Sequence, residues 1–320
     1  MNINIELLKE FEKTIDTINP ETGDIPIKIL GFGEISLVFE IIGDPEQLAY
    51  KRIPIFENEK QVRRHIWAYN EYCKIIENDI GIILPEHKVI WFLDDKGKIQ
   101  FYSIQAKINP ESVGNKIIHQ VSDDEIEVLI LLVLRELKKV WTLNKENPDL
   151  EIGLDGQVSN FVLIEYDSKN PNVTENSKLL YLDTSTPMLR KNGMEAMEAE
   201  LFLNSTPSFL RFLIKAFFIQ DVLDRYYDLR LVIIDLLANF FKEQLPKIIP
   251  RLIKRVNIFL KEEVSEFQID PITFIEVQKY YKSDKMIWVI FQKARRIDRY
   301  IKTKLLKKNY DFYLPEKIKR

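Results

Sequence analysis

The sequence predicts an α+β fold of two lobes: a small lobe with a five-stranded antiparallel sheet and one helix, and a larger, mostly helical lobe. Three observations lead to this prediction. Five strand-like apolar runs lie within the first 106 residues, and a stretch with helical spacing separates the third run from the fourth. From residue 107 onward, helical spacing dominates. We therefore expect an N-terminal lobe over residues 1–106, which begins with a helix of its own, and a C-terminal lobe over residues 107–320.

Composition limits the class of protein. Of the 320 residues, 46% are apolar and 30% are charged, which is typical of a soluble globular chain. The longest apolar run, Val128–Leu134, is too short for a membrane span, and the first six residues lack the pattern of a signal peptide. Cys73 is the single cysteine, which excludes an intramolecular disulfide and favours the cytoplasm.

The small lobe begins with an amphipathic pattern over residues 3–18, which predicts a short helix. Three strand-like runs follow, at Ile25–Leu30, Glu34–Ile41 and Leu48–Ile55. Gly31 and Gly33 lie at the first turn between them. Apolar positions at spacings of four and three predict a helix over residues 57–78. His87–Leu93 and Ile99–Ala106 then predict a hairpin.

The larger lobe begins after the chain break at Asn109-Pro110. Ser122 resembles a helix N-cap, and the helix that follows over Ile126–Leu143 is apolar on most sides, which predicts a buried central helix. Strand-like runs come next at Phe161–Tyr166 and Lys178–Leu182, and helical spacing extends from Glu195 to Leu306.

The first chemical motif reads G-x-G-x-x-S-x-V over Gly31, Gly33, Ser36 and Val38, and A-x-K follows, ending at Lys51. Glycines at such a turn allow backbone N–H groups to approach a phosphate. A hairpin that simply needs a flexible turn is the alternative. By strand alternation Lys51 shares an apolar face with its neighbours two residues away, so its ammonium group needs an anionic partner.

The second motif is acidic. Asp155 stands five residues before Asn160 in a loop-like run, and Asp183 ends the apolar run Leu179–Leu182. Carboxylate and amide oxygens are ligands that Mg²⁺ accepts while keeping other positions for water and phosphate. Each acidic residue also has a structural explanation, because Asp155 could form an Asx turn beside Gly156 and Asp183 could cap a helix.

The order of these motifs, from about residue 25 to residue 190, resembles the protein-kinase-like superfamily. The most similar subgroup is the small-molecule kinases of the aminoglycoside phosphotransferase and choline kinase type. The resemblance implies a two-lobed protein-kinase-like fold and an ATP- and Mg²⁺-dependent transfer of phosphate to a hydroxyl of a small molecule. It implies Asp155 as the base, Asn160 and Asp183 as metal ligands, and Lys51 as the phosphate partner.

The resemblance also implies a nucleotide site. Gly31, Gly33, Ser36 and Val38 would line the phosphate loop. A helix glutamate would hold Lys51, and Glu71 fits the sequence distance better than Glu59, although Glu71 lies opposite the main apolar stripe of its helix. Residues 104–108 would form the hinge near adenine, which includes Gln105 and Lys107.

Two departures keep alternatives open. Gly153 stands where the family has a histidine, and Thr184 follows Asp183 where the family has an aromatic residue. A pseudokinase that binds nucleotide or a protein partner is therefore an alternative to the kinase that we expect. A second alternative is a nucleic-acid-binding protein, because residues 285–320 carry 12 Lys and Arg against three acidic residues. This basic segment could meet an anionic partner, or be a solvated helix face.

Overall fold

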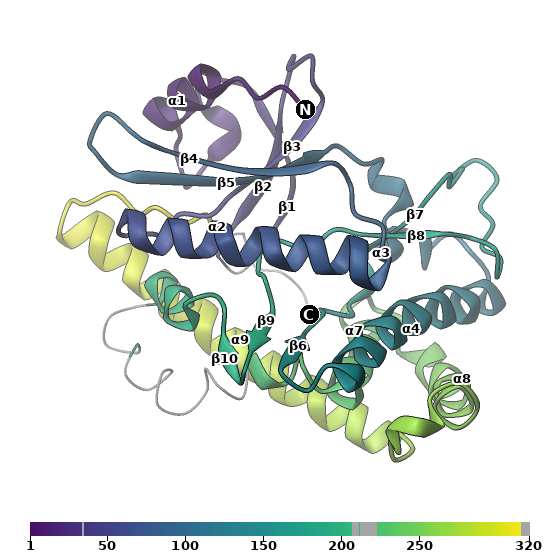
Figure 1. Ribbon diagram of the computed structural model, residues 1–320. Coiled ribbons are helices and arrows are strands. Elements are labelled where there is room, and N and C mark those ends of the chain that lie inside the picture. The colour runs from purple at the N-terminus through teal and green to yellow at the C-terminus, as the bar shows by residue number, and fades with distance from the viewer. Residues whose placement is uncertain (34, 207–210, 212–222, 315–320) are drawn as a thin grey trace.

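The computed structural model describes residues 1–33, 35–206, 211 and 223–314. Its two lobes lie one above the other in Figure 1, with helix α2 running beneath the sheet of the upper lobe. The upper lobe contains one antiparallel sheet, and the lower lobe is mostly helical. The α+β fold class predicted from the sequence is confirmed.

The sheet of the first lobe has the strand order β1-β2-β3-β5-β4. Its strands span Ile27–Phe32 (β1), Leu37–Ile41 (β2), Leu48–Arg52 (β3), His87–Leu93 (β4) and Ile99–Ala106 (β5). The last two match the prediction. Glu34, with which the second predicted strand begins, lies outside the described residues. β3 ends three residues before its predicted end, because Pro54 has no N–H to donate to a neighbouring strand.

Helix α1 (Ile5–Thr14) covers one face of this sheet with Leu8 and Phe11. On this covered face, β3 buries Tyr50 and Arg52, whereas Lys51 lies on the half-buried opposite face. The predicted alternation is present, and the face that Lys51 shares with Ala49 is the less buried of the two along β3. Arg52 can be buried because Glu12 accepts two hydrogen bonds from its guanidinium group, at 2.7 and 2.9 Å.

Helix α2 (Glu59–Lys74) covers the opposite face of the sheet and continues as one π-helical turn over Ile75–Ile80. Asn58 caps its first turn by accepting a hydrogen bond from the N–H of Gln61. The helix buries His65, Tyr69 and Tyr72, so these side chains reach toward the junction of the lobes.

The second lobe is organised around α4 (Asp123–Glu146), which begins with a capping box between Ser122 and Glu125. Its residues Ile130, Val133 and Leu134 have no exposed surface. This confirms a central buried helix. Helices α7 (Leu229–Lys242), α8 (Ile249–Glu262) and α9 (Phe274–Tyr300) complete the described part of the lobe, together with the short α3 (Gly114–Ile117).

Among the described residues, five short strands form two small sheets in this lobe. β7 (Phe161–Leu163) and β8 (Leu179–Tyr181) pair antiparallel and correspond to the strand-like runs at Phe161–Tyr166 and Lys178–Leu182, although both strands are shorter than predicted. The other three strands, β6 (Leu150–Ile152), β9 (Leu189–Lys191) and β10 (Met194–Glu195), were not predicted, and each is only two or three residues long. Part of the helical pattern predicted over Glu195–Leu306 falls on residues 207–210 and 212–222, which lie outside the described residues.

The chain returns to the first lobe after α9. Tyr310, Phe312 and Leu314 are buried in one cluster with residues of β5 and of the segment after β3. The backbone carbonyl of Asp311 also accepts a hydrogen bond of 2.7 Å from Arg52. We call residues 310–314 the C-terminal strap. The boundary between the two lobes, which the sequence places between residues 106 and 107, remains a prediction.

Candidate functional site

Lys51 and Asp183 meet between the two lobes. The Lys51 Nζ lies 2.8 Å from Asp183 Oδ1, although 132 residues separate them in the sequence. Lys51 extends from β3 of the first lobe, and Asp183 follows β8 of the second. About a quarter of each side chain is exposed, so the ion pair borders solvent and is accessible to a ligand.

Asp183 is held as an anion. Burial alone would raise the pKa of its carboxyl group, but the charge and hydrogen bond of Lys51 outweigh that effect, and the pKa lies below its ordinary value. Ser185 adds a hydrogen bond of 3.2 Å from its hydroxyl to the same carboxylate oxygen.

Asp155 lies in the opposite environment. Its burial, followed by the negative charges of Asp235 and Asp183, raises its pKa to about 7. One carboxylate oxygen accepts a hydrogen bond of 3.1 Å from the backbone N–H of Gln157, which orients the side chain. This bond is an Asx turn, so the structural explanation given above for Asp155 holds and is compatible with a chemical role.

Asn160 joins the two acidic segments. Its side-chain N–H donates to the carbonyl of Asp155 at 3.2 Å, and its own backbone carbonyl accepts from the N–H of Leu182 at 2.8 Å. The structure therefore brings together four residues that the sequence singled out: Lys51, Asp155, Asn160 and Asp183.

Two tyrosines support the loop at Gly153. The Tyr72 hydroxyl donates to the Gly153 carbonyl at 2.9 Å, and the Asp155 N–H donates to the Tyr181 hydroxyl at 3.3 Å. A Cβ atom at Gly153 would lie 2.9 Å from the carbonyl oxygen of Tyr226, so a histidine does not fit there without movement of the backbone. Tyrosine hydroxyls thus hold the backbone of this loop at residues 153 and 155.

The glycine-rich turn joins β1 and β2. The Gly33 N–H donates to the Ser36 carbonyl at 3.0 Å, and a Cβ atom at Gly33 would lie 2.7 Å from the Ser36 hydroxyl. Ser36 is buried, which directs its hydroxyl into the turn. Val38 pairs with Lys51 on the neighbouring strand, and Gly31 pairs with Val38. The turn therefore lies beside Lys51.

Glu71 is not the partner of Lys51. Its carboxylate accepts a hydrogen bond of 2.9 Å from Lys191 of β9, and the charge of Lys191 lowers the pKa of Glu71. The predicted Lys51–Glu71 pair is therefore corrected to Lys51–Asp183 and Lys191–Glu71. The physical reason is helix geometry, because Glu71 lies on the face of α2 that is turned away from the sheet. Glu59, the other candidate, pairs with Arg63 at 3.1 Å.

Gln105 and Lys107, the two residues predicted at the hinge, make different contacts. The Gln105 side chain donates to the Leu182 carbonyl at 2.8 Å and thereby links β5 to the segment that carries Asp183. Lys107 instead forms an ion pair with Glu40 of β2, and its backbone N–H donates to the Gln47 carbonyl at 3.1 Å. That donor is already used within the chain.

Sequence reasoning missed two buried groups near the site. His65 of α2 contacts the Ser185 carbonyl at 3.2 Å through Nε2, and its burial lowers its pKa to about 4, so the ring is neutral. Asp235 of α7 accepts a hydrogen bond of 3.2 Å from the Gln157 side chain. Asp235 could have been found, because it is the single charged residue within the apolar run from Leu231 to Leu237.

The residues present fit a magnesium ion. Asn160 offers an amide oxygen, and Asp183 has a second carboxylate oxygen besides the one that binds Lys51. Mg²⁺ needs one or two protein ligands when phosphate oxygens and water fill the other positions. Across the described ranges, no group of three or more His, Cys, Asp or Glu is arranged for a metal, so an all-protein cage is not what these residues form.

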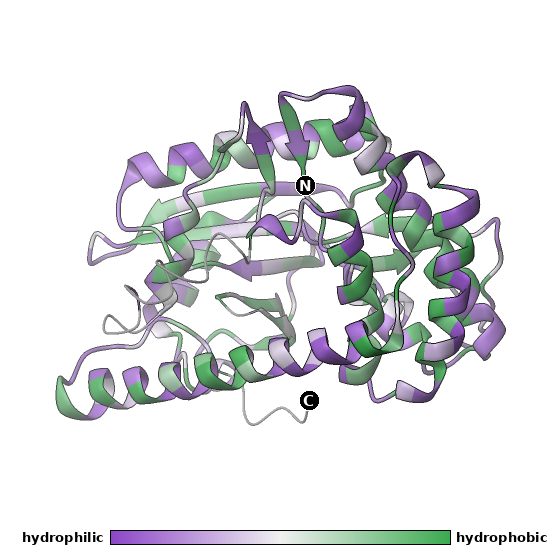
Figure 2. Cartoon of the chain, turned by 90° about the horizontal axis from the view of Figure 1, so that it is seen from below, coloured by the Kyte–Doolittle hydropathy of each residue, from purple (hydrophilic) through white to green (hydrophobic). Residues whose placement is uncertain are grey.

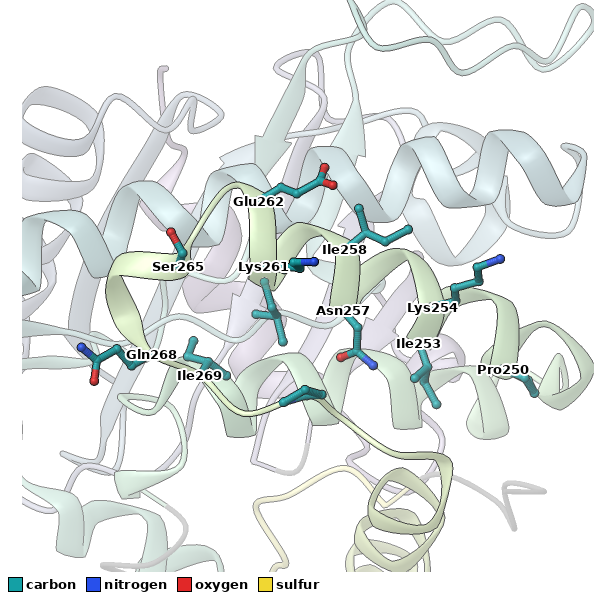
Figure 3. Close-up of a pocket in the computed structure, with 12 residues that line it drawn as sticks. Pro250, Ile253, Lys254, Asn257, Ile258, Lys261, Glu262, Ser265, Gln268 and Ile269 are labelled. Carbon is teal, nitrogen blue, oxygen red and sulfur yellow. The ribbon is translucent and has the colours of Figure 1, made fainter.

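A large open groove lies elsewhere, between α8 and the segment that follows it (Figure 3). Its volume is about 840 Å³. Asn257 lies in this groove, but both ends of its side-chain amide already bind the backbone of Ile272, at 2.8 and 2.9 Å. The groove contains none of the predicted site residues.

In the part of the chain that the structure describes, no helix is both long enough and apolar enough to cross a bilayer.

Comparison with known proteins gives one family and several similar structures. The model of a family of unknown function, DUF6206, matches residues 10–299. No curated protein matches the chain. Among solved structures, WaaP in complex with acyl carrier protein is 12% identical, with coverage of 71% of this chain and 89% of that chain and a TM-score of 0.31. The GDP complex of wild-type aminoglycoside 2'-phosphotransferase-IIIa is 11% identical, with coverage of 72% and 91% and a TM-score of 0.31.

Proposed function

The chain belongs to the family DUF6206, and we propose that it is a phosphotransferase that uses ATP and Mg²⁺ to phosphorylate a hydroxyl of a small molecule. The observation that carries this proposal is the 2.8 Å contact between Lys51 and Asp183, with Asp155 and Asn160 tied to the same segment by hydrogen bonds. Four residues from two lobes form one constellation whose parts match the needs of phosphoryl transfer.

Lys51 and Asp183 would bind groups of opposite charge. In the proposed complex, the ammonium group of Lys51 binds phosphate oxygens, while Asp183 and Asn160 hold Mg²⁺. The ion would neutralise charge on the β- and γ-phosphates. Because Lys51 and Asp183 bind each other in the structure, each is already oriented toward the point where the nucleotide phosphates would lie.

Asp155 would act on the acceptor. Its raised pKa suits a group that takes a proton near neutral pH. The acceptor hydroxyl would pass its proton to the Asp155 carboxylate as its oxygen bonds to the γ-phosphorus, and the bond from that phosphorus to the ADP oxygen would break. The tyrosine contacts at Gly153 and the Asx turn at Gln157 hold the base in position for this step.

The nucleotide would lie beneath the β1–β2 turn. Gly31, Gly33, Ser36 and Val38 belong to β1, β2 and the turn between them, and Val38 pairs with Lys51; the backbone near Gln105 and Lys107 would lie at the hinge. Since the Lys107 N–H is bonded to Gln47, we propose that other backbone groups between residues 104 and 108 contact the base. Gln105 has a positioning role through Leu182.

The test is a binding experiment with isothermal calorimetry and thermal unfolding, in which ATP and GTP are each added with and without Mg²⁺. A bound nucleotide raises the apparent stability by about 2.7 kcal/mol when its concentration is 100 times the dissociation constant. We expect Mg²⁺-dependent binding that Lys51→Ala abolishes. Lys28→Ala is the matched control, because Lys28 is an exposed lysine of β1, which lies in the same sheet two strands away from β3. Absence of nucleotide binding by the unaltered chain would refute the proposal.

A further inference from the structure

The second half of α9 has an inverted arrangement of side chains. The side of the helix that faces the protein buries the polar residues Gln292, Arg295 and Asp298, and the one apolar residue buried among them is the small Ala294. Arg295 is fully buried and lies over the rings of Phe291 and Phe312, at 5.6 and 5.4 Å. A surface helix of a globular protein normally turns its apolar face inward, so the opposite arrangement needs a physical explanation.

The outward side carries large apolar side chains. Met286 is 59% exposed, Ile290 56%, Ile297 52% and Tyr300 60%. Beyond the helix, Leu305 and Leu306 are 65% and 55% exposed. Single exposed apolar residues are common on proteins, but a continuous row of them marks a surface that binds something.

Cations lie on the same side of α9. Residues 286, 290, 293, 297 and 300 follow one another at spacings of four and three, which places them on one face of α9. Lys293 belongs to this series, Lys304 lies in the π-helical turn Ile301–Leu305 that continues the helix, and both lysines are exposed. Residues 282–308 contain ten Lys and Arg against two Asp, which is a net charge of +8. Figure 2 shows hydrophobic and hydrophilic turns alternating along α9 in the view from below.

We infer that the outward face of the second half of α9, from Met286, together with the segment that follows the helix as far as Lys308, docks the protein onto an anionic phospholipid surface. The apolar side chains would enter the boundary between headgroups and acyl chains, while the lysines would contact lipid phosphates and carboxylates. Tyr300 has the amphipathic ring that suits this boundary. This surface is separate from the site around Lys51, and the inference does not depend on the proposed phosphotransferase activity.

The combination of side chains favours lipid over nucleic acid. A nucleic-acid surface would use the lysines but would leave Met286, Ile290 and Ile297 against a polar, charged backbone. An anionic bilayer accommodates both kinds of side chain at once. Only the outward residues of the basic segment would contact the lipid. Arg295 is buried against the protein, and Lys302 already pairs with Asp298 at 2.7 Å.

The experiment is sedimentation of the whole chain with vesicles of phosphatidylcholine alone and of phosphatidylcholine with about 30% phosphatidylserine. We expect binding to the anionic vesicles that weakens as salt is added. Lys293→Glu with Lys304→Glu should weaken binding at least about tenfold, because each lysine near the surface contributes roughly 1 kcal/mol. Ile290→Ser with Ile297→Ser should weaken it about as much at low salt.

Matched controls are Met194→Ser, which alters an exposed apolar residue of β10, and Lys88→Glu, which alters an exposed lysine of β4. Both should bind vesicles like the unaltered chain. Equal binding to neutral and anionic vesicles, no binding to either, or tighter binding to duplex DNA that the two lysine changes remove would each overturn the inference.

A labelling experiment tests whether the face is free before docking. Cys73 is buried and its pKa is raised to about 12, mainly by burial, so it reacts slowly with thiol reagents. Ile290→Cys should therefore be the rapidly labelled position in the free monomer, and anionic vesicles should slow its labelling. Slow labelling of a cysteine introduced at position 290 in the absence of vesicles would mean that something other than lipid covers this face, and would overturn the inference. A dimer detected by light scattering, in which this cysteine is protected, would overturn it as well.

Discussion

The two acidic loops of the second lobe place their carboxylates in opposite electrostatic environments. Asp183 faces a cation, Lys51, and its pKa lies below the ordinary value. Asp155 is buried and faces other carboxylates, first Asp235 and then Asp183, so its pKa is raised to about 7, mainly by burial. The pKa values of the two carboxyl groups therefore differ, and so does the chemistry open to each. Asp183 stays charged and can bind cations, while Asp155 can exchange a proton near neutral pH.

The difference comes from which element each loop faces. The Asp183 loop lies against the first lobe, where β3 supplies Lys51 and β5 supplies Gln105. The Asp155 loop lies against α7 of its own lobe, which supplies Asp235. Contact between lobes thus produces the cation-binding carboxylate, and contact within one lobe produces the proton-binding carboxylate.

The strongest test of this comparison is Asp183→Ala. Loss of this carboxylate should abolish Mg²⁺-dependent nucleotide binding and lower turnover at least about 10³-fold, because phosphoryl transfer depends on positioning and charge neutralisation. Calorimetry with Mg²⁺ and ATP measures the binding. Unchanged ATP affinity in a folded variant would remove Asp183 from the site.

Asp155→Asn should separate binding from chemistry. The asparagine keeps an oxygen that can accept the Gln157 N–H, so the loop should hold its shape. We expect nucleotide affinity close to that of the unaltered chain and turnover lowered about 10²- to 10⁴-fold, the usual range for loss of a general base. Consumption of ATP in the presence of hydroxylated acceptors measures turnover. Turnover that survives the change would mean that Asp155 is not the base.

The pH profile of turnover should report the raised pKa. Asp155 accepts a proton only when ionised, so turnover should rise with pH through about 7 and then level off. Asp235→Asn removes a negative charge that raises this pKa, so the rise should move to lower pH. Gln157 can still donate to an asparagine oxygen at 235, which limits structural change. A profile with the same midpoint in both proteins would contradict the coupling.

The smallest effect should be on stability, with opposite signs for the two loops. The folded-state pKa of Asp155 is raised, so the stability that its protonated form gives is complete below its ordinary pKa of about 4 and is lost as pH rises to about 7. Asp155→Asn should therefore add roughly 1–3 kcal/mol to the free energy of unfolding at pH 8 and a smaller amount at pH 5. The pKa of Asp183 is depressed, so its contribution is present above its ordinary pKa and is lost in acid. Asp183→Asn should thus destabilise the fold at both pH values. Urea unfolding at pH 5 and pH 8 measures both variants, and destabilisation by Asp155→Asn at pH 8 would contradict the comparison.

Local patterns in the sequence were enough to predict much of the fold. The capping box at Ser122 and the continuous apolar surface of α4 correctly indicate a buried central helix. The hairpin of β4 and β5 follows from a turn rich in Asp, Lys and Gly between two apolar runs. The order of motifs around Lys51, Asp155, Asn160 and Asp183 indicated residues that the fold then brings together.

The remaining features depend on partners that are distant in the sequence. The burial of Arg52 requires Glu12, Gln100 and the backbone of Asp311 at once, and no short window contains them. Glu71 was assigned by sequence distance, but the direction of its side chain on α2 decides its partner, Lys191. The strands β6, β9 and β10 are too short to leave a periodic pattern.

The C-terminal strap has a consequence for synthesis of the protein. The cluster that contains Phe56 and Phe101 is completed by Tyr310, Phe312 and Leu314, which are translated some two hundred residues later. Domains usually fold in the order in which they leave the ribosome. Here this cluster of the lobe made first closes only when residues 310–314 have been made, after α7, α8 and α9 of the second lobe.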